Sequence, residues 1–157
     1  MDKQIYDKIK RGEKNLADSL FYKANLDGFD LSGIDFTCSD VVEASLIGAN
    51  LEQAFLFGSD LSDANLSDSN LKSANLQNTR LRGANLSGAN LMYVNAIDAD
   101  FSNVNFKGVN LEYANLCRTN LRGANLLCAK LEGIRLSGAI IDDGKGNEYI
   151  LGRFEDY

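Results

Sequence analysis

The stretch Ala64-Asn65-Leu66-Ser67-Asp68 recurs with small changes as ANLSG at 84–88 and as ANLLC at 124–128, and this five-residue unit decides the fold. A large apolar residue returns at every fifth position from Leu16 to Ile141, through 26 consecutive units, and only Ala96 interrupts the series. Self-similarity at one fixed period is typical of a repeat architecture in which each unit packs on its neighbours.

Each position of the unit has its own preference. In the 24 units whose large residue falls between Leu26 and Ile141, that residue is Leu in 18. The residue two positions earlier is Ala, Ser, Thr or Val in 21 units, and the residue between them is Asn in 13 and Asp in five. Gly stands two positions after the large residue in ten units. The unit therefore reads small, Asn or Asp, large, variable, often Gly.

A period of five fits neither an amphipathic helix nor a plain alternating strand. The small residue, the Asn and the Leu can alternate in, out and in, as three strand residues would. The next two residues must then turn the chain, and Gly permits the positive φ that many turns need. A chain that turns the same way in every unit coils, with successive coils about 4.8 Å apart. The pattern thus predicts a solenoid of β coils.

These units resemble the pentapeptide repeat proteins, whose motif is A-[DN]-L-x-x in tandem. The resemblance covers about four fifths of the chain. It implies an all-β fold, a right-handed quadrilateral parallel β-helix with one pentapeptide on each of four sides. At 20 residues per coil, we expect about six coils. The resemblance also implies a family that is abundant in cyanobacteria and whose members mostly have no assigned biochemical activity.

We expect three segments in a single domain. Residues 1–14 should form an N-terminal capping helix, with Ile5 and Ile9 on one face of a helix over residues 2–11, because open coils present unpaired edges. Contact of this basic helix with a membrane surface is the alternative. Residues 15–141 should form the β-helix. Residues 142–157 should form a C-terminal cap with a hairpin-like turn, which Phe154 and Tyr157 help to cover.

Targeting and thiol patterns favour a soluble cytoplasmic protein. The N-terminus lacks the apolar run of a secretory signal, and no stretch is long enough to span a bilayer. Cys38, Cys117 and Cys128 all occupy variable positions, so we expect three exposed, unpaired thiols. Cys38 and Cys117 share a side but lie about four coils, roughly 19 Å, apart, which no disulfide spans. Unpaired thiols suit a reducing compartment.

The composition argues against an enzyme. Histidine, the commonest general base and metal ligand, is absent. The scattered cysteines do not form a zinc pattern, and no phosphate-binding glycine motif occurs. Calcium at Asp142, Asp143 and Glu148 is an alternative that lacks the spaced ligands of known loops. We therefore expect no catalytic residue, no metal and no cofactor.

Residues twenty apart should stack, and this places surface side chains in columns. The column Asp40, Asp60, Arg80, Asp100, Asn120 puts Arg80 between two aspartates, and a second column pairs Asp98 with Arg118. We interpret both as structural charge ladders. Asparagine columns should hydrogen-bond along the stack as amide ladders do. One such column contains Asn50, Asn70, Asn90 and Asn110.

Four aromatic residues are not explained by the repeat, and they are our candidate partner-binding residues. Phe55 replaces the usual Asn and Phe57 follows Leu56, so both rings should emerge on one side of one coil. Tyr93 and Tyr113 should stack one coil apart. Cross-strand packing is the structural alternative for both pairs. Adjacent exposed aromatics also suit a protein interface or a self-association contact.

The leading functional hypothesis is therefore a non-enzymatic scaffold that binds an unknown protein partner, with a monomer expected and a dimer as the alternative. Its net charge of −6 argues against direct nucleic-acid binding. The rival comes from the resemblance, because some family members mimic DNA and modulate DNA gyrase or protect it from quinolones. Residues 15–79 carry a net −8, from ten acids and two bases, whereas residues 80–141 carry +3, from four acids and seven bases. Only the first half would mimic DNA.

Overall fold

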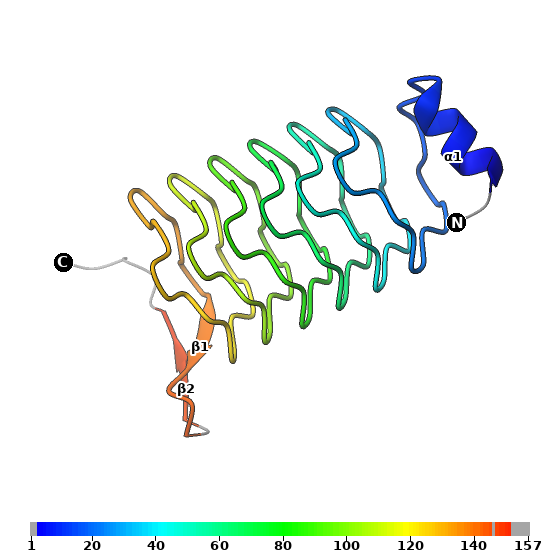
Figure 1. The fold of residues 1–157 in the computed structure, drawn as a ribbon. Helices are drawn as coiled ribbons and strands as arrows, with labels where there is room; N and C mark the ends of the chain where they lie inside the picture. The colour runs from blue at the N-terminus through cyan, green and yellow to red at the C-terminus, as the bar shows by residue number, and fades with distance from the viewer. Residues whose placement is uncertain (1–2, 146, 152–157) are drawn as a thin grey trace.

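The computed structural model describes residues 3–145 and 147–151, and they form a rod of stacked coils (Figure 1). Every isolated bridge in the rod is parallel and joins residues twenty apart, from Asn15 with Asp35 to Asn120 with Ile140. Four pentapeptides therefore complete one coil, which gives the rod four faces. The expected β-helical coil of 20 residues is what the structure shows.

The backbone hydrogen bonds explain the stacking of the coils. The N–H of Leu26 donates to the Ser45 carbonyl at 2.7 Å, and the N–H of Ser45 donates to the Ala24 carbonyl at 2.8 Å. At the corner between two successive units, the Ala24 N–H closes a turn on the Phe21 carbonyl at 2.8 Å. Each unit thus contributes one bridging residue, its Asn or equivalent, in place of the expected three-residue strand, because the turn takes up the rest of the unit.

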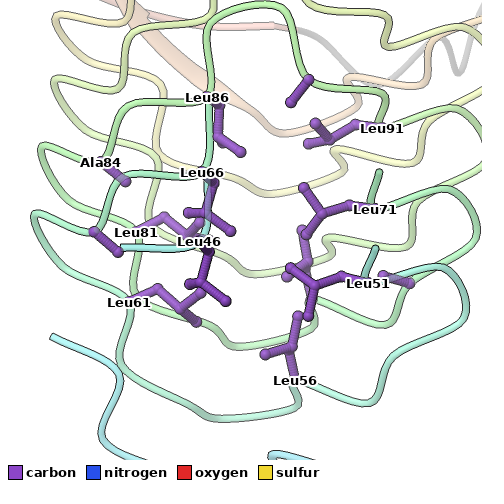
Figure 2. Packing of buried hydrophobic residues seen from close by; sticks show 14 of the residues in the cluster. Leu46, Leu51, Leu56, Leu61, Leu66, Leu71, Leu81, Ala84, Leu86 and Leu91 are labelled. Atoms are coloured by element: carbon purple, nitrogen blue, oxygen red, sulfur yellow. The ribbon is translucent and has the colours of Figure 1, made fainter. Parts of the chain in front are cut away.

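The large and small residues of the units fill the interior. Leu46, Leu66 and Leu86 lie above one another in successive coils, as Figure 2 shows, and none is more than 1% exposed. Buried hydroxyls at the small position find partners in the backbone. For example, Ser59 donates to the Leu56 carbonyl at 2.6 Å. The core is therefore a continuous apolar column whose few polar groups are satisfied.

The second variable position of the unit lies in the left-handed region of backbone conformation. This explains why Gly is frequent there, since φ is +63° at Gly48 and +71° at Gly83. Several non-glycine residues adopt the same conformation, including Tyr93 at +61° and Tyr113 at +58°. A bulky residue at positive φ is an outlier. The corner of each unit is thus set by the coil geometry, whichever residue occupies it.

The first end of the rod carries helix α1, Lys3–Lys10. Ile9 is 8% exposed and belongs to the core cluster, and Ile5 packs against that cluster. The Tyr6 ring meets Phe29 edge to face, with 5.6 Å between the ring centroids. The chain leaves the helix at Gly12, which has a φ of +77°. The helix expected over residues 2–11 is present with slightly shorter bounds.

The last coil ends in an antiparallel hairpin of β1, Ile140–Asp142, and β2, Glu148–Ile150. Ile140 pairs with Ile150 in its register, which confirms the expected hairpin-like turn. After β2, the N–H of Leu151 donates to the Ala139 carbonyl at 2.8 Å. The expected covering role of Phe154 and Tyr157 lies outside the described residues. No helix in the described part of the chain is long and apolar enough to cross a membrane.

Candidate interaction surface

Asparagine ladders cover much of the rod's surface. Asn85 shows the pattern, because its Oδ1 accepts the Ser87 N–H at 3.2 Å and the Asn105 amide at 3.0 Å, while its own Nδ2 donates to Asn65 at 3.2 Å. The side chain thus holds its own turn and ties three coils together. The ladder is predicted by the repeat, whereas the hydrogen bond that the Ser87 N–H donates to Asn85 is not.

The predicted column at positions 50, 70, 90 and 110 is confirmed over its first two steps. Asn70 donates to Asn50 at 3.0 Å and Asn90 donates to Asn70 at 3.2 Å. Asn110 departs from the pattern, since its Nδ2 donates to Glu112 at 3.3 Å within the same unit. These side-chain hydrogen bonds link successive coils and therefore have a structural role. Outward residues that do not take part in such bonds are the candidates for another role.

The predicted charge pairs are also present. Arg118 makes a two-pronged contact with Asp98, with Nε to Oδ1 at 2.7 Å and a terminal nitrogen to Oδ2 at 2.6 Å. This pairing holds the pKa of Asp98 below its ordinary 3.8. Arg80 approaches Asp60 at 4.0 Å, but among the described residues it forms no ion pair with Asp100, the other aspartate of its column. The pairs lie at the surface, where screening by water makes such contacts weak.

One face differs from this pattern, and we call it the Phe55 face. It comprises the outward side chains of residues 35–38, 55–58, 75–78, 95–98, 115–118 and 135–138, which the bridges align in one column. Phe55 is 53% exposed and Phe57 is 42% exposed. One coil earlier in this column lies Asp35, whose Oδ1 accepts the Thr37 N–H at 2.9 Å. Phe55 has no acceptor, so its unit forgoes the turn bond that an Asn or Asp would supply.

The other aromatic candidates lie on a neighbouring face. Tyr93 is 52% exposed and Tyr113 is 46% exposed, and their rings stack with centroids 5.3 Å apart and an interplanar angle of 12°. The Tyr113 hydroxyl donates to Glu132 at 3.1 Å, and this carboxylate raises the pKa of Tyr113 above its ordinary 10.0. A Cβ at Gly133 would clash with the Tyr113 ring. The two tyrosines therefore have contacts within the protein, namely ring stacking between them and the Tyr113 hydrogen bond, that restrain their side chains.

A groove that the sequence analysis missed lies near the C-terminal end of the Phe55 face. It has a volume of about 570 Å³, and its lining is partly apolar and partly basic. The lining residues are Ile97, Asn115, Cys117, Arg118, Arg135, Ser137, Gly138 and Ile140. The available signals were Ile97 at a variable position and Arg135 in an Asn position of the repeat.

The expectation of three exposed thiols is wrong for one of them. Cys38 and Cys128 are exposed, but Cys117 is buried, with 9% of its surface accessible. Cys117 lines the groove together with Ile97 and Arg135. All three thiols are free.

Two of the three carboxylates of the calcium alternative, Asp142 and Asp143, have hydrogen-bond partners within the protein. Asp142 accepts the N–H groups of Gly123 at 2.7 Å and Gly144 at 2.8 Å. Asp143 accepts the Asn147 amide at 2.8 Å. Within residues 3–145 and 147–151, no three His, Cys, Asp or Glu side chains gather as a group that could hold a metal ion.

Stacked coils tied together by ladders of asparagine define a β-helical repeat protein. The model of the pentapeptide repeats matches this chain in eight copies, at residues 15–53, 59–95, 69–108 and 99–138. These segments cover well over half of the sequence, so the chain belongs to the pentapeptide repeat family. Known structures of this family are right-handed β-helices, and its members are generally structural or interaction modules. A comparison with curated proteins gives no match.

Solved structures of two trypsin-treated variants of QnrB1, a plasmid-mediated fluoroquinolone resistance protein, resemble this chain. One is 28% identical over 80% of this chain, with a TM-score of 0.73, and the other is 27% identical over 80%, with a TM-score of 0.76. This chain spans only 64% and 63% of those two QnrB1 chains. The pentapeptide repeat protein Rfr23 from the cyanobacterium Cyanothece 51142 is 28% identical, covering 89% of this chain and 97% of its own, with a TM-score of 0.43.

Proposed function

We propose that this protein is a non-enzymatic scaffold that binds a protein partner through Phe55 and Phe57. The observation that carries this proposal is the exposure of both residues, 53% and 42%, at the two outward positions that flank the buried Leu56. Exposed, neighbouring aromatic side chains are the residues that most often anchor protein interfaces. The family's general role as a structural or interaction module agrees with a binding function.

The local energetics support a role beyond folding. An Asn at position 55 would accept a backbone N–H, as Asn75 accepts that of Gln77 at 3.1 Å in the next coil. Such a bond contributes about 0.5 to 1.5 kcal/mol. Phe55 gives up this bond and still leaves half of its surface in water. A partner that covers both rings would recover roughly 25 cal/mol for each Å² of apolar surface removed from water.

The test compares partner capture by the parent protein and two variants. The double variant Phe55→Ala and Phe57→Ala should lose a partner that the parent protein captures from its native host. The matched control is Ile47→Ala, because Ile47 is 40% exposed on the opposite face. Size-exclusion chromatography of the same variants tests self-association. If the double variant and the parent capture the same proteins and elute alike, the proposal fails.

The alternative function is a DNA-mimicking modulator of DNA gyrase or a related topoisomerase. Two observations favour it, namely the likeness to QnrB1 and the net charge of −8 over residues 15–79. A DNA duplex carries one charge per about 1.7 Å, or roughly 14 to 17 over a six-coil rod. The net +3 over residues 80–141 does not continue the mimicry. A gyrase supercoiling assay that shows no effect at micromolar protein would remove this alternative.

Three further assignments complete the proposal. Helix α1 caps the first coil, because Ile5 and Ile9 extend the core there. The protein works in the reducing cytoplasm, which the three free thiols favour. It is a monomer until it meets its partner, with a dimer as the alternative that size-exclusion chromatography tests.

A further inference from the structure

The phenylalanines and the groove lie on the same face and are joined by one column of bridges. The column runs from Phe55 through Asn75, Asn95 and Asn115 to Arg135. Four coil steps separate its ends, which amounts to about 19 Å at the usual spacing of β strands. An extended peptide advances about 3.3 Å per residue, so roughly six residues span this distance. A short extended segment can therefore touch both features at once.

The two ends of this span differ in chemistry. At one end lie the exposed rings of Phe55 and Phe57. At the other end, Ile97 and the buried Cys117 give the groove an apolar lining, and Arg135 is the basic residue of that lining that has no aspartate or glutamate partner among the described residues. Arg135 is exposed and forms no ion pair with any residue that the structure describes. The groove end thus offers an unpaired positive charge beside an apolar lining.

Neighbouring charges give the face a polarity. Asp35 lies one coil before Phe55 in the same column, so it disfavours a carboxylate at the phenylalanine end. At the groove end, the Arg118 guanidinium is held by Asp98 at 2.6 Å, which neutralises that aspartate. Charge complementarity across an interface mainly sets orientation and partner choice. An acidic group of a partner is therefore directed to the groove end.

We propose that the Phe55 face binds an extended segment of a partner protein, about six residues long, with apolar side chains on Phe55 and Phe57 and carboxylates at Arg135. This inference rests on the proposed function, and it adds the chemistry and the length of the partner segment. The apolar residues and the carboxylates of the segment lie at opposite ends.

The native cysteines report on the two ends of the site separately. Cys38 lies beside the phenylalanine end, because a Cβ on Gly58 would be 3.5 Å from its Sγ. Cys117 lines the groove, and Cys128 is exposed on the opposite face. The rate at which a small thiol reagent, methyl methanethiosulfonate, modifies each cysteine is measured by peptide mass spectrometry. Cys128 serves as the internal control.

The probes are capped hexapeptides of composition Phe-Leu-Ser-Ser-Glu-Glu, made in both chain directions because the structure does not fix the direction. A version with Lys in place of both Glu is the charge control. At a peptide concentration four times its Kd, the modification of Cys38 and Cys117 should slow about fivefold, as expected when four fifths of the sites are occupied. Cys128 should not change, and the Lys peptide should protect neither end.

Two charge-reversed variants in the same coil test the role of Arg135. Arg135→Glu should weaken binding of the acidic peptide by about fivefold, the order expected from losing an exposed ion pair and adding a repulsion. Lys130→Glu, on a different face, should leave the Kd unchanged. Far-UV circular dichroism of each variant checks that the coil is intact. Equal effects of the two reversals would overturn the assignment of the carboxylates to Arg135.

The outcomes separate this inference from the proposed function. Protection of Cys38 alone overturns the inference and leaves binding at the phenylalanines standing. Protection of neither thiol also overturns it, while partner capture by the alanine variants decides the proposed function independently. If deletion of residues 152–157 is what opens Cys117 to the reagent, the occupant is the chain's own C-terminal segment and the inference is wrong. If protection follows protein concentration, the occupant is a second copy and the inference is again wrong.

Discussion

Asn85 and Asn95 occupy equivalent positions of the repeat and are both half-buried, yet their side chains differ in hydrogen bonding. The Asn85 side chain takes part in three hydrogen bonds, to Asn65, Ser87 and Asn105. The Oδ1 of Asn95 is buried and has no hydrogen-bond partner in the described structure. Substitution by alanine should therefore have very different effects at the two sites.

The magnitude follows from the bonds that are lost. Three partly exposed hydrogen bonds, each near the lower end of the usual range, predict that Asn85→Ala lowers the free energy of unfolding by about 2 kcal/mol. For a chain of 157 residues this corresponds to a fall in Tm of about 4 to 8 °C. Asn95→Ala removes an unpaired buried oxygen, so it should be neutral or stabilise by up to about 1 kcal/mol.

Thermal unfolding followed by circular dichroism measures both variants. Asn85→Asp is a useful intermediate, because a carboxylate still accepts the Ser87 N–H and the Asn105 amide but cannot donate to Asn65. Its Tm should fall between those of the parent and the alanine variant. If Asn95→Ala costs as much as Asn85→Ala, the ladder bonds are not what stabilises these positions, and this reasoning is refuted.

Three other predictions follow from packing and charge. Ala96→Leu should destabilise by about 1 to 3 kcal/mol in urea unfolding, because Phe101 and Phe106 already fill that coil with rings 5.2 Å apart; a gain in stability would mean that Ala96 leaves a void. Gly133→Ala should cost more than Gly48→Ala, since both have positive φ but only the first meets a ring, that of Tyr113; equal values of Tm would contradict this. The Asp98 pKa is lowered by Arg118, so its contribution to stability is present above about pH 4 and is lost as the pH falls through the lowered value. The Tm advantage of the parent over Asp98→Asn should shrink from pH 7 to pH 2, and a constant difference would refute the pairing.

Much of the fold could be predicted from the sequence because the repeat is nearly uninterrupted. The inward Leu reports burial in the core, the small residue reports close packing, and the corner Gly reports a positive φ. Once the family resemblance supplies four units per coil, the columns of residues twenty apart follow. The hydrogen bond that the Ser87 N–H donates to the Asn85 side chain was not predicted, because it depends on a turn geometry that the period of the repeat does not reveal. The turn geometry also explains why each unit has one bridging residue and not the expected three-residue strand.

The candidate surface was predictable only in part. The exposure of Phe55 and Phe57 follows from their register alone, so the sequence indicated both. The groove and the burial of Cys117 depend on the relative sizes of side chains in successive coils, such as Ile97 and Cys117, which lie twenty residues apart and both line the groove. The repeat pattern predicts only whether a side chain points inward or outward. It does not predict how exposed each outward side chain is, because that depends on the sizes of its neighbours.

The role of Phe55 and Phe57 in partner binding is tested most directly by the affinity of the captured partner for three proteins, measured by surface plasmon resonance. The account predicts that the Phe55→Ala and Phe57→Ala double variant raises Kd at least about tenfold, the equivalent of 1.4 kcal/mol, because two anchoring rings are lost. The Ile47→Ala control should retain the parent's Kd. Equal affinities for the parent and the double variant, with both folded by circular dichroism, would contradict the account.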